Sequence, residues 1–222
     1  MMLEIDCAGE RLALLAEKAV FWPRERAMII ADLHLGKPAA FRRAGVAVPE
    51  GTTLGDLERL DKILRETDSR RLIVLGDFFH ARAGLQPEML DTVAAWREQN
   101  AALEIILIPG NHDRKSGSPP ALWRVLETEE CWSRPPFLFC HEPHAEPESY
   151  MLSGHLHPAI VLREAYGGGV RAPCFCFGKR SAILPAFGSF TGMSNLQPQR
   201  GDRIFAISRV DNEVMELTVP SR

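Results

Sequence analysis

The feature that most constrains this sequence occurs five times: a short apolar run ends directly in a polar cluster. The runs are rich in Ile, Val, Leu and Phe and span residues 27–31, 71–75, 103–108, 136–140 and 150–153. Continuous apolar runs of this length are typical of strands that are buried on both faces of a sheet. Because α/β sheets collect functional groups at the carboxyl ends of their strands, the pattern predicts one site built from five separate segments.

The polar groups that follow these runs are of the kinds that bind metal ions. They are Asp32, His34, Asp77, Asn111, His141, His155 and His157. Asp32 and His34 flank a single residue, so both can point from one loop toward one ion, and the two oxygens of Asp77 can bridge two ions. Imidazole, carboxylate and amide groups without a thiolate suit Mn, Fe or Zn rather than a cysteine-based structural zinc.

Each cluster taken alone also has an ordinary structural explanation. A single histidine such as His141 is more often a surface or hydrogen-bonded residue than a ligand. Gly110-Asn111 alone is equally typical of a turn. The joint occurrence of five clusters, each at the end of an expected strand, is what favours a metal centre.

Helical patterns separate the first apolar runs. Thr53 can cap one helix, and Pro87 suits the first turn of a second. Pro120 is expected to open a third helix, with Leu122 and Leu126 turned inward. After about residue 158 short strands replace helices. We therefore expect an α/β fold with a βαβ-like front half and a β-meander tail, in a single domain over residues 1–222.

Charge and composition exclude several classes of protein. The chain has 26 Lys and Arg against 29 Asp and Glu, a net charge of −3, so it is not a polycation that binds nucleic acid by bulk charge. No apolar stretch approaches the ~20 residues of a membrane span, and no leader sequence is recognisable, so we expect a cytoplasmic protein without a membrane partner. The five cysteines form no CxxC pair and are expected to be small buried thiols.

The ordered motifs DxH, GD, GNHD, H and GHxH resemble those of the calcineurin-like binuclear metallophosphoesterase superfamily. The resemblance implies a four-layer α/β/β/α sandwich that holds two divalent ions. It implies that Asp32, His34 and His157 hold the first ion, that Asn111, His141 and His155 hold the second, and that Asp77 bridges them.

The same resemblance gives His112 and Asp113 catalytic roles. His112 would face the scissile phosphate and donate a proton to a phosphoryl or leaving oxygen, with Asp113 behind it to fix its tautomer. Two ions about 3.5–4 Å apart would activate water and clamp the attacking and leaving oxygens. His80, three residues after Asp77, is a candidate to reach the site from behind the ligands.

Further segments resemble the bacterial ligase-associated DNA damage response endonucleases. They are residues 32–37, 41–45, 48–52 and 184–192. This likeness implies a phosphodiesterase that cuts DNA, single-stranded or flexible, with manganese as the favoured ion. It also implies a functional association with a DNA ligase, a helicase and an exonuclease of a repair cluster. Protein phosphatases carry GDxVDRG, whereas His80 here replaces the later Asp of that motif.

Basic residues adjoin the motifs and are candidates to contact substrate phosphates. They are Lys37, Arg42, Arg43, Arg82 and Arg114. Basic residues on loops are equally often only solvated, so both interpretations stay open.

Two alternative functions remain. A phosphodiesterase or nucleotide pyrophosphatase that acts on a small molecule would share the chemistry, and a deep closed pocket would favour it, whereas an open groove with a basic rim would favour DNA. A non-catalytic scaffold on this fold would lack ligands or His112, and this sequence lacks none of them.

Overall fold

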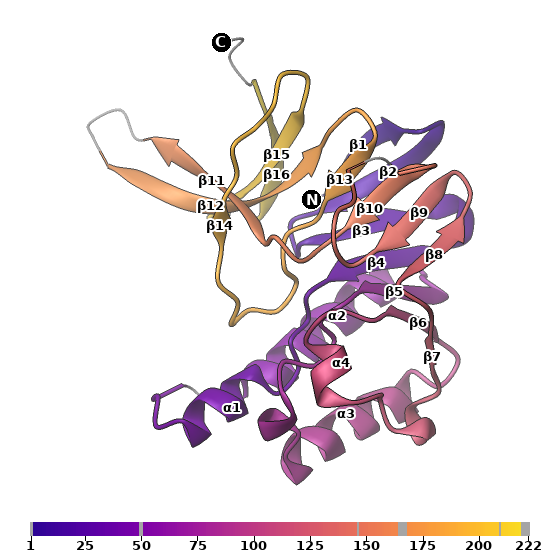
Figure 1. Cartoon of the computed structure of the whole chain (residues 1–222), viewed down its shortest axis with the longest axis vertical. Helices are drawn as coiled ribbons and strands as arrows, with labels where there is room; N and C mark the ends of the chain where they lie inside the picture. The colour runs from indigo at the N-terminus through magenta and orange to yellow at the C-terminus, as the bar shows by residue number, and fades with distance from the viewer. Residues whose placement is uncertain (1, 49–50, 146, 164–167, 209, 219–222) are drawn as a thin grey trace.

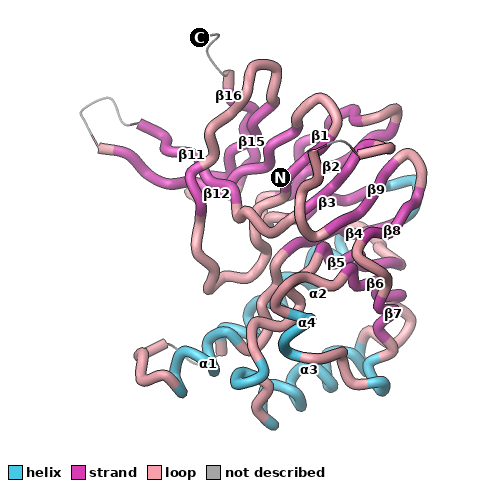
Figure 2. Tube along the Cα trace, in the orientation of Figure 1, coloured by secondary structure: helices cyan, strands magenta, loops and turns pink. Residues whose placement is uncertain are grey.

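The computed structural model of the chain describes residues 2–48, 51–145, 147–163, 168–208 and 210–218. Two stacked β-sheets form its centre, and the helices gather on the outer side of one sheet (Figures 1 and 2). The α-helices are α1 (Lys37–Arg43), α2 (Thr52–Glu66), α3 (Pro87–Gln99) and α4 (Asp113–Ser116). Single 3₁₀ turns are η1 (Pro23–Glu25), η2 (Arg82–Gly84) and η3 (Ala121–Trp123).

The first sheet changes from antiparallel to parallel along its strand order, which follows the chain. Its strands are β1 (Met2–Cys7), β2 (Glu10–Leu15), β3 (Ala19–Trp22), β4 (Ala27–Ala31), β5 (Arg71–Leu75), β6 (Glu104–Ile108) and β7 (Val125–Glu127). Neighbours from β1 to β4 are antiparallel, and those from β4 to β7 are parallel. In the parallel part Ala31 pairs with Leu75 and Leu75 with Ile108, so three motifs begin side by side.

The second sheet carries the other two motifs. Its strands are β8 (Cys131–Arg134), β9 (Phe137–Cys140), β10 (Tyr150–Ser153), β11 (Pro158–Arg163), β12 (Gly169–Phe177), β13 (Ser181–Ile183), β14 (Ser194–Asn195), β15 (Arg203–Ser208) and β16 (Glu213–Leu217). The strand order is β14-β11-β12-β13-β10-β9-β8, with β15 beside β12 and β16 beside β15. Parallel pairing of β9 and β10 places the segments after Cys140 and Ser153 next to each other.

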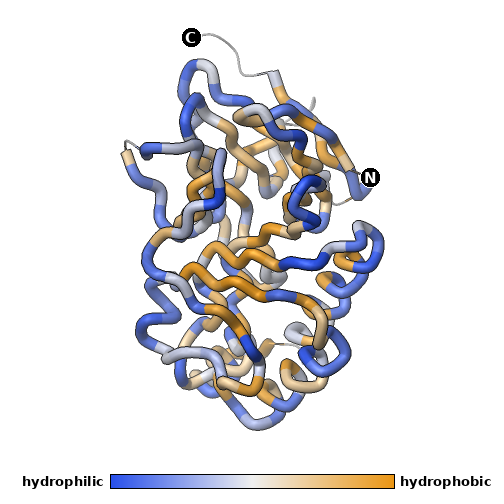
Figure 3. Tube along the Cα trace, turned by 90° about the vertical axis from the view of Figure 1, so that its right-hand side faces the viewer, coloured by the Kyte–Doolittle hydropathy of each residue, from blue (hydrophilic) through white to orange (hydrophobic). Residues whose placement is uncertain are grey.

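Two apolar cores hold these layers together. One lies between the sheets, where Ile29 and Ile73 of the first pack with Phe139 and Phe175 of the second. The other lies between the first sheet and the helices and includes Leu60 of α2. Figure 3 shows hydrophobic stretches running through the middle of the molecule, with hydrophilic segments toward its outside. Full burial of one such side chain contributes about 1.5–3 kcal/mol, so these layers fix the strand ends firmly.

The fold class expected from the sequence is confirmed. All five apolar runs are strands, the helix that begins at Pro87 is present, and no described residue after Trp123 is helical. The described helices cover the first sheet only. The outer face of the second sheet carries a small apolar cluster around Cys174, Cys176 and Ile204, so the fourth, helical layer has no counterpart in the described residues.

Two expectations about the middle of the chain are wrong. The helix expected after Pro120 is a single 3₁₀ turn, because Arg124 takes a left-handed backbone (φ 49°) and the chain then joins the sheet as β7. Leu122 and Leu126 consequently point outward, with 80% and 55% of their surfaces exposed.

The expectation of five thiols is also wrong, since Cys131 and Cys140 form a disulfide. They lie directly opposite each other on antiparallel β8 and β9, a register that spacing alone does not reveal. The other three cysteines are buried thiols.

No helix within the described residues is long and apolar enough to cross a membrane.

Candidate metal centre

The loops after the strands hold their polar side chains in an unusual backbone conformation. Left-handed φ angles occur at Asp32 (53°), His34 (50°), Asp77 (48°), His155 (67°) and His157 (46°). Such angles are uncommon outside glycine and cost about 1–3 kcal/mol each. Five of the seven expected ligands therefore share a costly backbone geometry, which is typical of a functional site.

One cluster joins the first and last motifs. Asp32, His34 and His157 place one ligand atom each within 4.8 Å of one another. The Nε2 atoms of His34 and His157 are 3.4 Å apart, and Asp32 Oδ1 is 3.4 Å from His157 Nε2. These atoms come from the ends of β4 and β10, which belong to different sheets.

A second cluster joins the middle motifs. Asp77, His141 and His155 form a group of the same kind. His141 Nε2 lies 3.1 Å from Asn111 Oδ1 and 3.1 Å from His155 Nδ1. These three residues and Asn111 each follow the end of a strand, as the sequence predicts: β5 for Asp77, β6 for Asn111, β9 for His141 and β10 for His155.

Asp77 faces both clusters. Its Oδ2 lies 3.6 Å from His34 Nε2, and its Oδ1 lies 3.5 Å from His141 Nε2. Asp77 is 2% exposed, and burial raises its pKa against the opposing effect of His141. A buried carboxylate with histidines on both sides has the geometry of a bridging ligand.

Backbone carbonyls orient two of the rings. His141 Nδ1 lies 3.0 Å from the carbonyl oxygen of Leu75, and His157 Nδ1 lies 3.1 Å from that of Gly192. A carbonyl only accepts, so each Nδ1 carries the hydrogen and each Nε2 keeps a lone pair directed into its cluster. Gly76 makes room for the first ring, because a Cβ there would lie 2.1 Å from His141 Nδ1.

The donor set fits two divalent ions. Burial, reinforced by the charge of Lys37, lowers the pKa of His34 to about 2, so its imidazole is neutral and able to coordinate a metal. Asp32 Oδ1 is buried without a hydrogen-bond partner among the described residues. Lone pairs and carboxylate oxygens that converge in a buried place are stabilised by a cation between them.

His112 lies beside the two clusters and reaches the surface. Its Nε2 is 3.9 Å from Asp77 Oδ2, and 35% of its side chain is exposed. Its Nδ1 lies 2.5 Å from the carbonyl oxygen of His80, and the two rings stack with centroids 4.9 Å apart. The His80 carbonyl therefore fixes the tautomer of His112 and leaves Nε2 directed toward the site.

The expectation that Asp113 orients the His112 ring is wrong, because Asp113 has other partners. Its buried carboxylate accepts hydrogen bonds from the backbone amides of Phe78 (3.2 Å), Phe79 (2.8 Å) and Gly110 (2.9 Å), not from the His112 ring. Asp113 thus ties the loop after β5 to the loop after β6. Burial raises its pKa, and the three amides oppose that shift.

Replacing Asp113 by Asn should destabilise the protein, because an amide group would face a buried backbone donor. We expect the free energy of unfolding in urea to fall by about 1–3 kcal/mol. Asp6→Asn, at an exposed carboxylate on β1, is the matched control and should leave it unchanged. Equal stability of both variants would contradict the role assigned to Asp113.

The basic residues lie at different depths. Lys37 is half-buried at the start of α1 and close enough to influence His34, and burial lowers its own pKa. Arg42, Arg43, Arg82 and Arg114 are exposed. Since α1 packs against η2, the first three of these arginines lie on adjoining elements.

Comparisons with known proteins show to which family the chain belongs. The sequence profile of the family described as calcineurin-like phosphoesterase matches residues 25–157. The chain belongs to this family and is a metal-dependent phosphoesterase, and its members use divalent ions.

Among solved structures, the chain resembles the nuclease MPE of Pseudomonas putida, with 40% sequence identity and a TM-score of 0.86. The match covers 98% of this chain and 100% of that one. A second match, the phosphoesterase Yfce of E. coli, has 12% identity and a TM-score of 0.40 over 86% of this chain and 97% of that one. A search of curated proteins found no match.

Proposed function

We propose that this phosphoesterase is a DNA endonuclease, that it uses two manganese ions, and that it acts on single-stranded DNA. The observation that carries the proposal is likeness to a nuclease over 98% of the chain, with 40% identity. We also propose that it cuts DNA during repair, in functional association with a DNA ligase, a helicase and an exonuclease. Its proposed location is the cytoplasm.

The proposal assigns a role to each side chain. Asp32, His34 and His157 would hold the first ion, Asn111, His141 and His155 the second, and Asp77 both. When bound, such ions activate water and stabilise charge on a phosphoryl oxygen. His112, held at Nδ1 by the His80 carbonyl, would offer Nε2 to the substrate phosphate or leaving oxygen.

The openness of the site favours a polymer over a small molecule. His112 keeps 35% of its side chain exposed, and Leu156, between His155 and His157, is 41% exposed. A flexible single strand can bring its backbone to such a surface. Lys37 would contact a phosphate near the ions, and Arg42, Arg43, Arg82 and Arg114 would contact phosphates farther along the strand.

The test is a cleavage assay with Mn²⁺ on three substrates: circular single-stranded DNA, duplex plasmid and a chromogenic phosphodiester. We expect the parent to linearise the single-stranded circle and to act poorly on the duplex, because a stiff duplex bends its backbone toward buried clusters less easily than a single strand does. Hydrolysis of the small diester with both DNAs intact would overturn the DNA assignment. It would favour a phosphodiesterase or pyrophosphatase for small molecules.

A further inference from the structure

A segment distant in sequence lies directly behind the loop of Asp32 and His34. The amide of Phe187 donates to the Ala31 carbonyl (2.7 Å), and the amide of Gly188 donates to the Asp32 carbonyl (3.2 Å). The approach is so close that a Cβ on Gly188 would lie 2.5 Å from the Leu33 carbonyl oxygen. Residues 187–192 are called the backing segment below.

The other end of the backing segment reaches the last motif. The Gly192 carbonyl oxygen lies 3.1 Å from His157 Nδ1 and so sets the orientation of that ring. One short segment therefore contacts the first cluster on two sides: it donates to the backbone of Ala31 and Asp32, where the loop that carries His34 begins, and it accepts from the ring of His157.

Asp56 of α2 anchors this segment. Its side chain is 7% exposed, and its two oxygens accept from the Ser189 amide at 3.1 and 3.0 Å. The Ser189 hydroxyl adds a bond of 2.5 Å to Oδ1. Three bonds to one carboxylate from one residue fix the backbone of Ser189 in place and leave little freedom for the turn before it.

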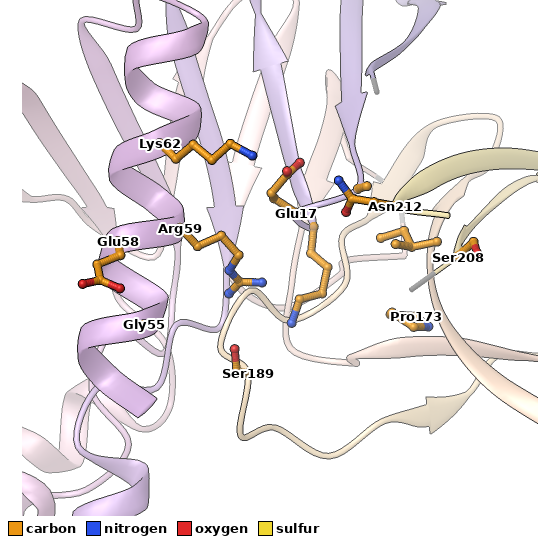
Figure 4. Close-up of a pocket in the computed structure, with 12 residues that line it drawn as sticks. Glu17, Gly55, Glu58, Arg59, Lys62, Pro173, Ser189, Ser208 and Asn212 are labelled. Atoms are coloured by element: carbon orange, nitrogen blue, oxygen red, sulfur yellow. The ribbon is translucent and has the colours of Figure 1, made fainter. Parts of the chain in front are cut away.

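Arg59, one turn along α2, completes the anchor. Its Nη2 donates to Asp56 Oδ1 (2.8 Å) and to the Phe187 carbonyl (2.6 Å), and its guanidinium lies 4.0 Å from the centroid of the Phe187 ring. Figure 4 shows Arg59 reaching from α2 toward the segment that carries Ser189, at the wall of a cavity of about 620 Å³. Glu58 points to the other side of the helix in the same view.

We propose that Asp56 is a positioning residue for the first metal position: through Ser189 and the backing segment it holds Asp32, His34 and His157 in their binding geometry. The inference rests on the metal-binding part of the proposed function and does not depend on the substrate. Groups that orient ligands from outside typically change metal affinity by about 10–100-fold when they are removed.

The test is a titration of metal-free protein with Mn²⁺, in which free Mn²⁺ is read by electron paramagnetic resonance. In Asp56→Asn an amide NH₂ faces donors, so we expect one of the two equivalents to bind about tenfold more weakly while the other binds as in the parent. Glu58→Gln is the matched control, an exposed acid-to-amide change on the same helix, and should match the parent. Melting curves recorded in parallel ensure that every variant is folded during the titration.

Two outcomes would overturn the proposal. In the first, Asp56→Asn has a lower melting temperature but binds both equivalents of Mn²⁺ with parental affinity. Asp56 would then act only on the stability of the fold. If Asp56→Asn does not fold, Ser189→Ala is used in its place, because it removes only the hydroxyl donor. We then expect a smaller loss of affinity for the same single equivalent of Mn²⁺. In the second outcome, Ser189→Ala binds both equivalents with parental affinity, which would overturn the proposal. A parent that binds two ions but leaves DNA intact would overturn the DNA substrate and not this inference.

Discussion

Replacing Asp77 by Asn should abolish metal-dependent hydrolysis. Asp77 is the residue that faces both clusters, with Oδ2 near His34 and Oδ1 near His141. The variant loses the negative charge between the two metal positions, so both ions should bind more weakly. The loss of several kcal/mol of transition-state stabilisation corresponds to roughly a 10³-fold fall in kcat, or more, on a chromogenic phosphodiester with Mn²⁺.

The control for this prediction is Asp91→Asn, an exposed carboxylate on α3. It should bind Mn²⁺ and turn over like the parent. An Asp77→Asn protein that keeps parental activity would mean that the carboxylate bridges nothing, and the two-metal account would fail with it.

Replacing His112 by Ala should separate turnover from metal binding. His112 lies outside the two ligand clusters assigned above, and its Nε2 faces Asp77 Oδ2 at 3.9 Å from a partly exposed position. Loss of one acid or donor group typically costs about 10²–10⁴-fold in rate. We therefore expect kcat to fall by that range in the Mn²⁺-dependent cleavage of circular single-stranded DNA.

Metal content decides how this result is interpreted. His112→Ala should bind two Mn²⁺ per chain with parental affinity, because its ring is not among the assigned ligands. Loss of bound metal in the variant would make His112 a ligand and would contradict its placement beside the ions. His112→Gln, which keeps a donor of similar length, should recover part of the rate.

Much of the site is visible in the sequence because strand ends and ligand types leave local patterns. Apolar runs identify buried strands, and parallel strands bring their carboxyl ends to one edge, so Asp32, Asp77 and Asn111 had to lie close together. Gly76, directly before Asp77, leaves the space that the His141 ring occupies. The pairing of clusters across two sheets came from the family resemblance.

Backbone partners leave no such pattern, and this is where sequence reasoning failed. The carbonyl of His80, not the carboxylate of Asp113, holds His112, and any residue type could supply it. Asp113 binds amides instead, a role that no spacing distinguishes from a contact with its neighbour. The role of Asp56 could not be predicted either, because its partner Ser189 is 133 residues away in the sequence.

Register and turns explain the remaining differences. The strands β1 to β3 are short antiparallel hairpins that turn at Ala8-Gly9 and Lys18, and they carry none of the motifs that drew attention to the other strands. The disulfide between Cys131 and Cys140 depends on the register of β8 and β9. The helix expected after Pro120 stops after one 3₁₀ turn because the backbone of Arg124 is left-handed, a conformation that its residue type does not favour.

The central claim of the proposed function is that this phosphoesterase cuts DNA with two ions that Asp77 would hold together. The most direct test adds Mn²⁺ stepwise to metal-free protein and records, in the same samples, bound Mn²⁺ per chain and the rate at which circular single-stranded DNA is cut. The account predicts that cleavage rises only as occupancy passes from one ion to two. Full activity at one ion per chain, or cleavage that persists in the presence of a chelator, would contradict it.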